Sequence, residues 1–136
     1  MNSQQSEIRV FVYGTLKPGK FNYLAYCQGK TIAEIPAYTK GQLYHLLPGY
    51  PAMTRGNNRV EGYLLSFSDG SILQSLDNLE DYCETRASEL NDYYRQQLPI
   101  YSLSDQSLGM AWCYLMTPEK IGEFQGQLLK NYSWNI

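Results

Sequence analysis

The sequence predicts an α+β fold built on a mainly antiparallel, strongly curved sheet. Segments rich in β-branched and aromatic residues dominate the chain, and helical patterns interrupt them without the regular strand–helix alternation of a doubly wound parallel sheet. The length of 136 residues is that of one ordinary domain of about 150 residues. We place that single domain at 8–136, after a polar and flexible N-terminal tail at 1–7.

The strands are predicted from their composition and from the turns that bound them. An apolar run at 8–13 is typical of a strand that is buried on both faces. Further strands are expected at 41–46 and 60–67, with a turn at 48–51 between them and a bulge at Gly62. Two more are expected at 92–102 and 109–116, on either side of a Ser-Asp-Gln-Ser turn.

Three helices are predicted between and after these strands. A short one covers 22–28, and a longer one covers 69–82 with Ser68 or Asp69 as its cap. The last begins at Thr117, where threonine caps the helix and proline occupies the first turn, and it extends to about Lys130.

Charge and composition exclude several classes of partner. Eleven basic against thirteen acidic side chains give a net charge of −2, which provides no positive field for nucleic acid or an anionic membrane. The N-terminus lacks a signal peptide, and the longest nearly apolar stretch, 108–116, is about half of the ~18 residues that a membrane span needs. We therefore expect a cytoplasmic protein. Its thirteen tyrosines suit either a small-molecule pocket or a tyrosine-rich sheet.

Metal and thiol chemistry have little support. The three cysteines are far apart and form no C-x-x-C pair, and His45 is the only histidine, so we expect no bound metal. His45 is interpreted as a sheet residue, and Cys113 as a small hydrophobic residue of the core.

The loop after the first strand is a candidate ligand-binding element. It matches G-x-x-x-x-G-K from Gly14 to Lys20, but Phe21 replaces the Ser or Thr that would hold magnesium, and Pro18 removes one N–H donor. A nucleotide site is thus disfavoured. The loop is either a tight turn after a core strand or a cradle of N–H groups for a smaller anion such as a substrate carboxylate.

Helical geometry singles out Glu80. With about 100° per residue, Glu80 falls within the apolar face of the 69–82 helix, whereas Asp77 lies on its edge and Asp81 points away. A carboxylate in apolar surroundings has a raised pKa and can act as a general acid/base near neutrality. The alternative is that Glu80 sits in a fraying last turn or pairs with Arg86 or Arg95.

Several motifs together carry a family resemblance. The strand and loop at 11–19, the Leu-Asp-Asn-Leu-Glu run at 76–80 and, in the same order, segments 49–52, 60–63, 93–95 and 111–114 resemble the γ-glutamylcyclotransferase family. The likeness covers about residues 8 to 116 and is strongest to the small γ-glutamylamine cyclotransferase and AIG2-like branch.

The resemblance implies a fold, an activity and a site. It implies a small β-barrel with flanking helices and a cofactor-independent enzyme that cyclises a γ-glutamyl amine or γ-glutamyl amino acid to 5-oxoproline. Glu80 would be its acid/base. By the same resemblance the glutamyl group would be bound by Tyr13, Gly14, Thr15 and Leu16, with weaker matches at Tyr93 and Arg95.

One segment departs from the family pattern. Residues 81–92 form a longer polar and acidic stretch, which we expect to overhang the pocket and contact the leaving amine. Two other functions remain open: a binding module that uses the same pocket without turnover, and a scaffold that is recognised through its tyrosine-rich surface.

Overall fold

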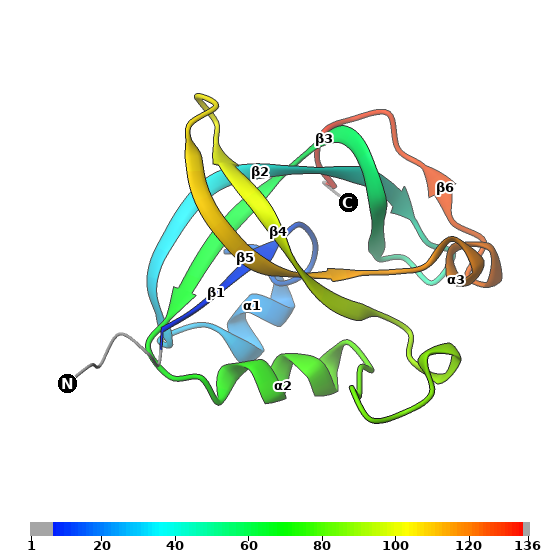
Figure 1. The fold of residues 1–136 in the computed structure, drawn as a ribbon, viewed down its shortest axis with the longest axis horizontal. Helices are drawn as coiled ribbons and strands as arrows, with labels where there is room; N and C mark the ends of the chain where they lie inside the picture. Colours follow the sequence, from blue (N-terminus) through cyan, green and yellow to red (C-terminus); the bar gives the residue numbers. More distant parts are fainter. Residues whose placement is uncertain (1–6, 135–136) are drawn as a thin grey trace.

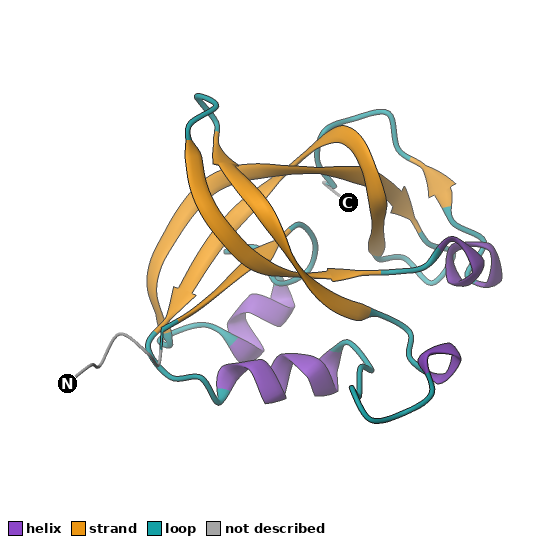
Figure 2. Cartoon of the chain, viewed as in Figure 1, coloured by secondary structure: helices purple, strands orange, loops and turns teal. Residues whose placement is uncertain are grey.

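A computed structural model describes residues 7–134, so residues 1–6 of the expected tail lie outside the described part. The elements follow in the order β1 (Ile8–Val12), α1 (Phe21–Tyr26), β2 (Thr31–His45), β3 (Pro51–Phe67), α2 (Ile72–Leu79), the 3-10 turn η2 (Ser88–Leu90), β4 (Tyr94–Ser102), β5 (Ser107–Leu115), α3 (Pro118–Glu123) and β6 (Gln127–Leu128). In Figure 1, α1 and α2 lie on the same side of the strands, and α3 lies beside β6. Figure 2 shows how the strands dominate the structure.

The strands close on themselves. β3 pairs with β1 and β2, β4 pairs with β2 and β5, and β5 returns to β1. All of these pairings are antiparallel except β1–β5, which is parallel at Val10 and Trp112. β6 adds a short edge to β2. The result is a closed, mixed five-stranded barrel with a few helices, which confirms the predicted α+β fold and its mainly antiparallel, curved sheet.

β2 and β3 are longer than predicted. Residues 31–40 precede the expected start of β2 and 51–59 that of β3. The missed half of β2 pairs with β3 on one side, whereas β4 joins it only at Ala37 and Tyr38. Glu34, Ile35 and Pro36 are consequently all exposed. A strand segment that is hydrogen-bonded along one edge only and exposed to solvent need not alternate between apolar and polar residues, and it tolerates proline. Its composition therefore does not indicate a strand.

The bulge expected at Gly62 is wrong. Pairing is regular there, and the β2–β3 register shifts instead between Gly41 and Gln42, where the partner changes from Asn58 to Thr54. Gly62 serves a different purpose, since a Cβ at this position would lie 2.1 Å from the carbonyl oxygen of Val12. Glycine therefore allows the backbones of β1 and β3 to approach closely.

α1 and α3 begin within one residue of the expected positions but are shorter, whereas α2 begins at Ile72 rather than Asp69, and its N-cap is Ser71 rather than Ser68 or Asp69. α2 starts after a turn in which the Asp69 carboxylate accepts from the Ser71 N–H, and it ends before Asp81, whose φ of 57° is incompatible with a helix. α3 is capped by Thr117 as predicted. It ends before Gln125, at φ 53°, so the helix expected to reach Lys130 is wrong in its second half, which instead forms β6. No helix within 7–134 is long and apolar enough to cross a membrane.

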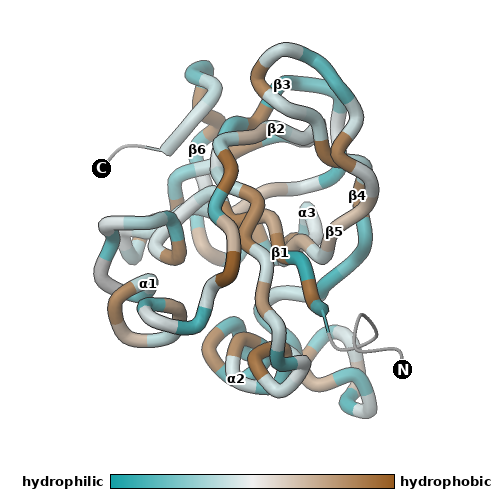
Figure 3. The backbone as a smooth tube through the Cα atoms, turned by 90° about the vertical axis from the view of Figure 1, so that its left-hand side faces the viewer, coloured by the Kyte–Doolittle hydropathy of each residue, from teal (hydrophilic) through white to brown (hydrophobic). Residues whose placement is uncertain are grey.

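The core consists of two groups of buried side chains. One lies between the barrel wall and the helices and contains Val10, Leu65, Leu76 and Met116. The other lies inside the barrel and contains Phe11, Leu64, Ile100 and Leu115. Figure 3 shows hydrophobic segments along the strands and in α2. Alternate residues of β1 serve the two groups, so this strand is buried on both faces, as its apolar run predicts.

Candidate active site

A cavity of about 560 Å³ opens beside the loop that follows β1. Its walls come from this loop, the turn between β2 and β3, the end of α2, the start of β4 and the C-terminal segment. Six of the residues singled out from the sequence line it: Tyr13, Gly14, Thr15, Leu16, Glu80 and Tyr93. The fold thus brings together two motifs that lie more than sixty residues apart in the chain.

The loop after β1 is fixed by its neighbours and leaves donors free. The Thr15 carbonyl accepts from the backbone N–H of Tyr23 at 3.1 Å, and its hydroxyl accepts from the Asn22 amide at 2.7 Å. The backbone N–H groups of Gly14, Thr15 and Leu16 donate no hydrogen bond to an acceptor within residues 7–134. A rigid loop with free N–H groups at a cavity can bind an anion.

Gly14 is required by packing. A Cβ at this position would lie 2.6 Å from Cγ of Pro51. The loop therefore packs against the start of β3 in a way that only glycine permits. From the sequence, Gly14 was expected only to help bind the glutamyl group, and its contact with Pro51 is a further, structural reason for glycine.

Glu80 caps the C-terminal end of α2 and faces the cavity. Its backbone N–H donates to the Leu76 carbonyl at 2.9 Å, so the residue is part of the last helical turn. Burial of its carboxyl group raises the pKa from 4.5 to about 7. Neither of the two arginines considered from the sequence is its partner, since Arg86 pairs with Asp81 and Arg95 with Asp77. The carboxyl group can therefore exchange a proton near neutral pH.

Asp77 and Arg95 form a buried ion pair behind the cavity. The Asp77 carboxylate accepts two hydrogen bonds from the Arg95 guanidinium, at 2.8 and 3.2 Å, and a third from the Tyr114 hydroxyl at 2.6 Å. Arg95 also stacks on Trp112, 4.6 Å from the ring centre. Arg95 is therefore not brought to the cavity wall together with the other expected site residues. It fixes α2 to the barrel.

Two predictions of helix phase are wrong. Asp77, placed on the edge of the helix, is only 7% exposed. Asp81, expected to point away, lines the cavity. Its positive φ turns the chain out of the helix, so a projection at 100° per residue does not describe it.

Tyrosines form much of the remaining wall. Tyr13 donates its hydroxyl to the Tyr114 carbonyl at 2.6 Å, and Tyr93 donates to the Pro51 carbonyl at 2.8 Å. Burial, with Glu80 as a further cause, raises the pKa of both phenols well above the usual value. Both therefore stay neutral and fix the shape of the wall.

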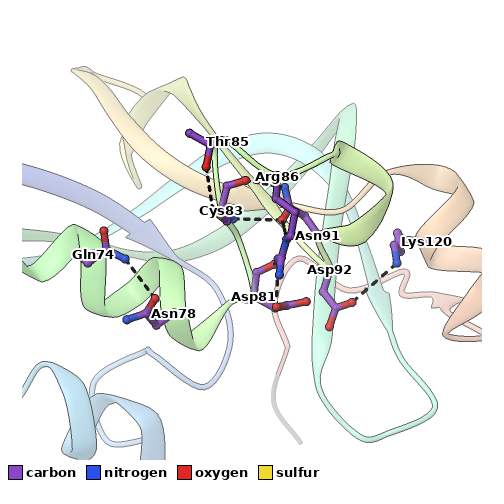
Figure 4. Close-up of polar contacts among 9 residues, drawn as sticks. All are labelled: Gln74, Asn78, Asp81, Cys83, Thr85, Arg86, Asn91, Asp92 and Lys120. Carbon is purple, nitrogen blue, oxygen red and sulfur yellow. Dashed lines mark hydrogen bonds and ion pairs between the residues drawn. The ribbon is translucent and has the colours of Figure 1, made fainter.

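The segment 81–92 reaches the cavity only at its two ends. The N–H of Asp92 donates to the Asp81 carbonyl at 3.1 Å, which closes the segment at its base, and both residues line the cavity. Figure 4 shows how Arg86 and Asn91 hold it and how Asp92 approaches Lys120 of α3, at 3.9 Å. The intervening residues 83–85 and 87–90 are exposed. The long segment thus forms a rim, and most of it extends into solvent.

The remaining polar and sulfur-containing candidates play structural roles. His45 lies at the end of β2 and accepts a hydrogen bond from the Trp134 indole. Cys113 is fully buried, and burial raises the pKa of its thiol. Within residues 7–134, no three His, Cys, Asp or Glu side chains form a group that could hold a metal ion.

Sequence reasoning missed three residues that line the cavity: Lys20, Asn22 and Trp134. Lys20 was noted only as the end of a phosphate-loop pattern. Asn22 follows it at the beginning of α1. Trp134 lies near the C-terminus, twenty residues beyond the last motif at 111–114, and no local pattern could have placed it there.

Comparison with known proteins identifies the family of the chain. A family model described as gamma-glutamyl cyclotransferase, AIG2-like, matches residues 10–135. The chain belongs to this family. No curated protein sequence matches it.

Solved structures share the fold at low sequence identity. The crystal structure of an AIG2-like protein from Mus musculus has a TM-score of 0.71 and 22% identity, over 96% of this chain and 89% of the mouse chain. A solution structure from Arabidopsis thaliana has a TM-score of 0.63 and 20% identity, over 88% and 81% of the two chains. A gamma-glutamyl cyclotransferase has a TM-score of 0.62 and 14% identity, over 82% and 67%. This chain therefore has the gamma-glutamyl cyclotransferase-like fold.

Proposed function

We propose that this protein is a γ-glutamylcyclotransferase that converts γ-glutamyl amines or γ-glutamyl amino acids to 5-oxoproline and a free amine. The observation that carries the proposal is Glu80, a carboxyl group with a pKa of about 7 that faces a cavity next to free backbone N–H groups. The family of the chain supports the reaction class.

In the proposed reaction Glu80 transfers protons within the substrate. Its carboxylate takes a proton from the α-ammonium group, and the freed amine attacks the γ-carbonyl carbon to close a five-membered ring. The bond to the leaving nitrogen then breaks as Glu80 protonates that nitrogen. Two protons leave the α-nitrogen in total and both end on the released amine, so Glu80 returns to its starting form without any cofactor.

The loop after β1 would hold the glutamyl half for this attack. The free N–H groups of Gly14, Thr15 and Leu16 would bind its α-carboxylate, with Tyr13 and Tyr93 as walls. An intramolecular attack is fast only when the reacting atoms are held in contact. The rim at Asp81 and Asp92 would face the leaving amine.

The test is to incubate the purified protein with a panel of γ-glutamyl amines and amino acids and to measure 5-oxoproline. Glu80→Gln keeps the shape but cannot accept a proton, so turnover should fall by at least about 100-fold while the binding of 5-oxoproline changes little. Glu89→Gln makes the same change at an exposed site outside the cavity and should leave turnover unchanged. Binding without any turnover by the wild type would favour a binding module instead.

A further inference from the structure

The C-terminal segment is bound to the barrel along its length. β6 pairs with β2 at Tyr44 and His45, and the Leu129 N–H donates to the carbonyl of Leu43. Further along, the Tyr132 carbonyl accepts from the N–H of Glu61 at 2.7 Å. In Figure 1 the segment turns back from β6 towards the other strands. These contacts lead Trp134 to the wall of the cavity.

Trp134 is held there from two sides. Its indole N–H donates to Nδ1 of His45 at 3.0 Å, and its carbonyl accepts from the ammonium of buried Lys17 at 2.6 Å. Its side chain is buried and belongs to the group inside the barrel. The indole is therefore a fixed surface beside the loop that follows β1.

Lys20 lies over this surface. Its Nζ is 5.9 Å from the centre of the Trp134 ring, and the residue lines the cavity. It is the only basic residue on the described cavity wall, whose other ionisable groups are acidic or phenolic. No carboxylate within residues 7–134 pairs with its ammonium group. A cation at a cavity without an anionic partner is suited to bind an anionic group of a ligand.

We propose that Lys20 binds the α-carboxylate of the glutamyl group, and that Trp134 is a positioning residue that holds the Lys20 ammonium at the cavity. This inference rests on the proposed function, because it assigns a role in binding the same substrate. The ammonium adds a charge to the free N–H groups of the loop, and the indole face favours a cation above it. The site then accepts γ-glutamyl compounds with a free α-carboxylate and discriminates against those in which it is amidated.

The test measures binding and needs no turnover. 5-Oxoproline carries the carboxylate, and its amide, 5-oxoprolinamide, lacks the charge but keeps the ring. Calorimetry on the wild type should give tighter binding of the acid than of the amide. Lys20→Met should weaken the binding of the acid about tenfold or more and leave the binding of the amide nearly unchanged. Lys40→Met, the same change at an exposed strand residue outside the cavity, should alter neither.

Trp134 has its own readout. Trp134→Leu should reduce the preference for the acid over the amide, and the double variant with Lys20→Met should lose no more of that preference than Lys20→Met alone. Trp134→Phe keeps an aromatic face and should retain most of it, which provides a second variant if leucine impairs folding. If Trp134 had only a general structural role, Trp134→Leu would instead weaken the binding of the acid and the amide to the same extent.

Three outcomes would overturn the inference: a wild type that binds neither compound, a Lys20→Met variant that keeps the preference, or one that loses both ligands equally. The proposed reaction fails separately. A wild type that binds 5-oxoproline through Lys20 but produces none from any substrate would contradict the reaction and leave the carboxylate site in place.

Discussion

Replacing Glu80 by glutamine should make the protein more stable at neutral and alkaline pH. The folded chain keeps the Glu80 proton up to about pH 7, whereas an ordinary glutamate releases it near pH 4.5. In that interval the folded state binds more protons than the unfolded state, so its stability falls as the pH rises from about 4.5 to 7 and then levels off. Glutamine carries no charge at any pH and removes this dependence.

The expected size follows from the shift. A pKa difference of 4.5 against about 7 corresponds to roughly 3 kcal/mol of free energy of unfolding, taken as an upper figure. The stability difference between Glu80→Gln and the wild type should grow by up to that amount between pH 4.5 and pH 8. Urea unfolding of both proteins at several pH values measures it. The wild-type kcat/KM should fall about tenfold per pH unit below pH 7, because protonation removes the base.

Glu89→Gln is the control for the stability series, since an exposed carboxyl group should show little pH-dependent difference. A difference between Glu80→Gln and the wild type that stayed flat from pH 4.5 to 8 would refute the buried, proton-exchanging carboxyl group. A wild-type rate that was constant down to pH 5 would refute its role as the base.

Three further results are expected. Asp77→Asn should lower the free energy of unfolding in urea by about 3–5 kcal/mol, because it leaves Arg95 buried with a weaker partner. Asp81→Asn changes a more exposed ion pair and should lower it by less than about 1 kcal/mol. Equal losses of stability in the two variants would contradict this assignment. Gly14→Val should lower both the melting temperature and substrate turnover, since its side chain collides with a proline ring; a stable variant would show that the loop can shift. Cys113→Ala should retain turnover at saturating substrate with some loss of stability, and a folded but inactive variant would contradict its role as a core residue.

The sequence predicted those parts of the fold in which the local residue pattern matches the burial and pairing of the segment in the structure. β1 was visible because both of its faces are buried, and α3 began at Thr117 because a threonine cap and a first-turn proline act within a few residues. The first half of β2 was missed because its residues 34–36 are paired with β3 alone and are exposed. The helix expected to reach Lys130 ends before Gln125, which has a positive φ. Glutamine has no preference for this conformation, so the sequence did not predict the end of the helix.

The candidate site was predictable to the same extent. Glu80 was found because it is the C-cap of α2 and its N–H still donates to Leu76, so helical spacing still applies there. Asp81, one residue later, was placed wrongly because the chain leaves the helix there. Lys20 and Trp134 meet only through tertiary structure, since the C-terminal segment is led back to the loop after β1 by its pairing with β2. Spacing along the chain contains no information on such a contact.

Asp77 and Glu80 show how one short helix can carry two carboxylates with opposite roles. Asp77 is buried with a guanidinium and a phenol as donors, so its charge is compensated and serves to attach α2 to the barrel. Glu80, three residues later, is partly buried without such a partner, so the cost of its charge remains and raises its pKa to about 7. The rigid attachment at Asp77 keeps Glu80 from moving towards solvent, where its pKa would return to normal. Weakening the attachment should therefore shift the pH profile of turnover towards lower pH, in addition to lowering stability.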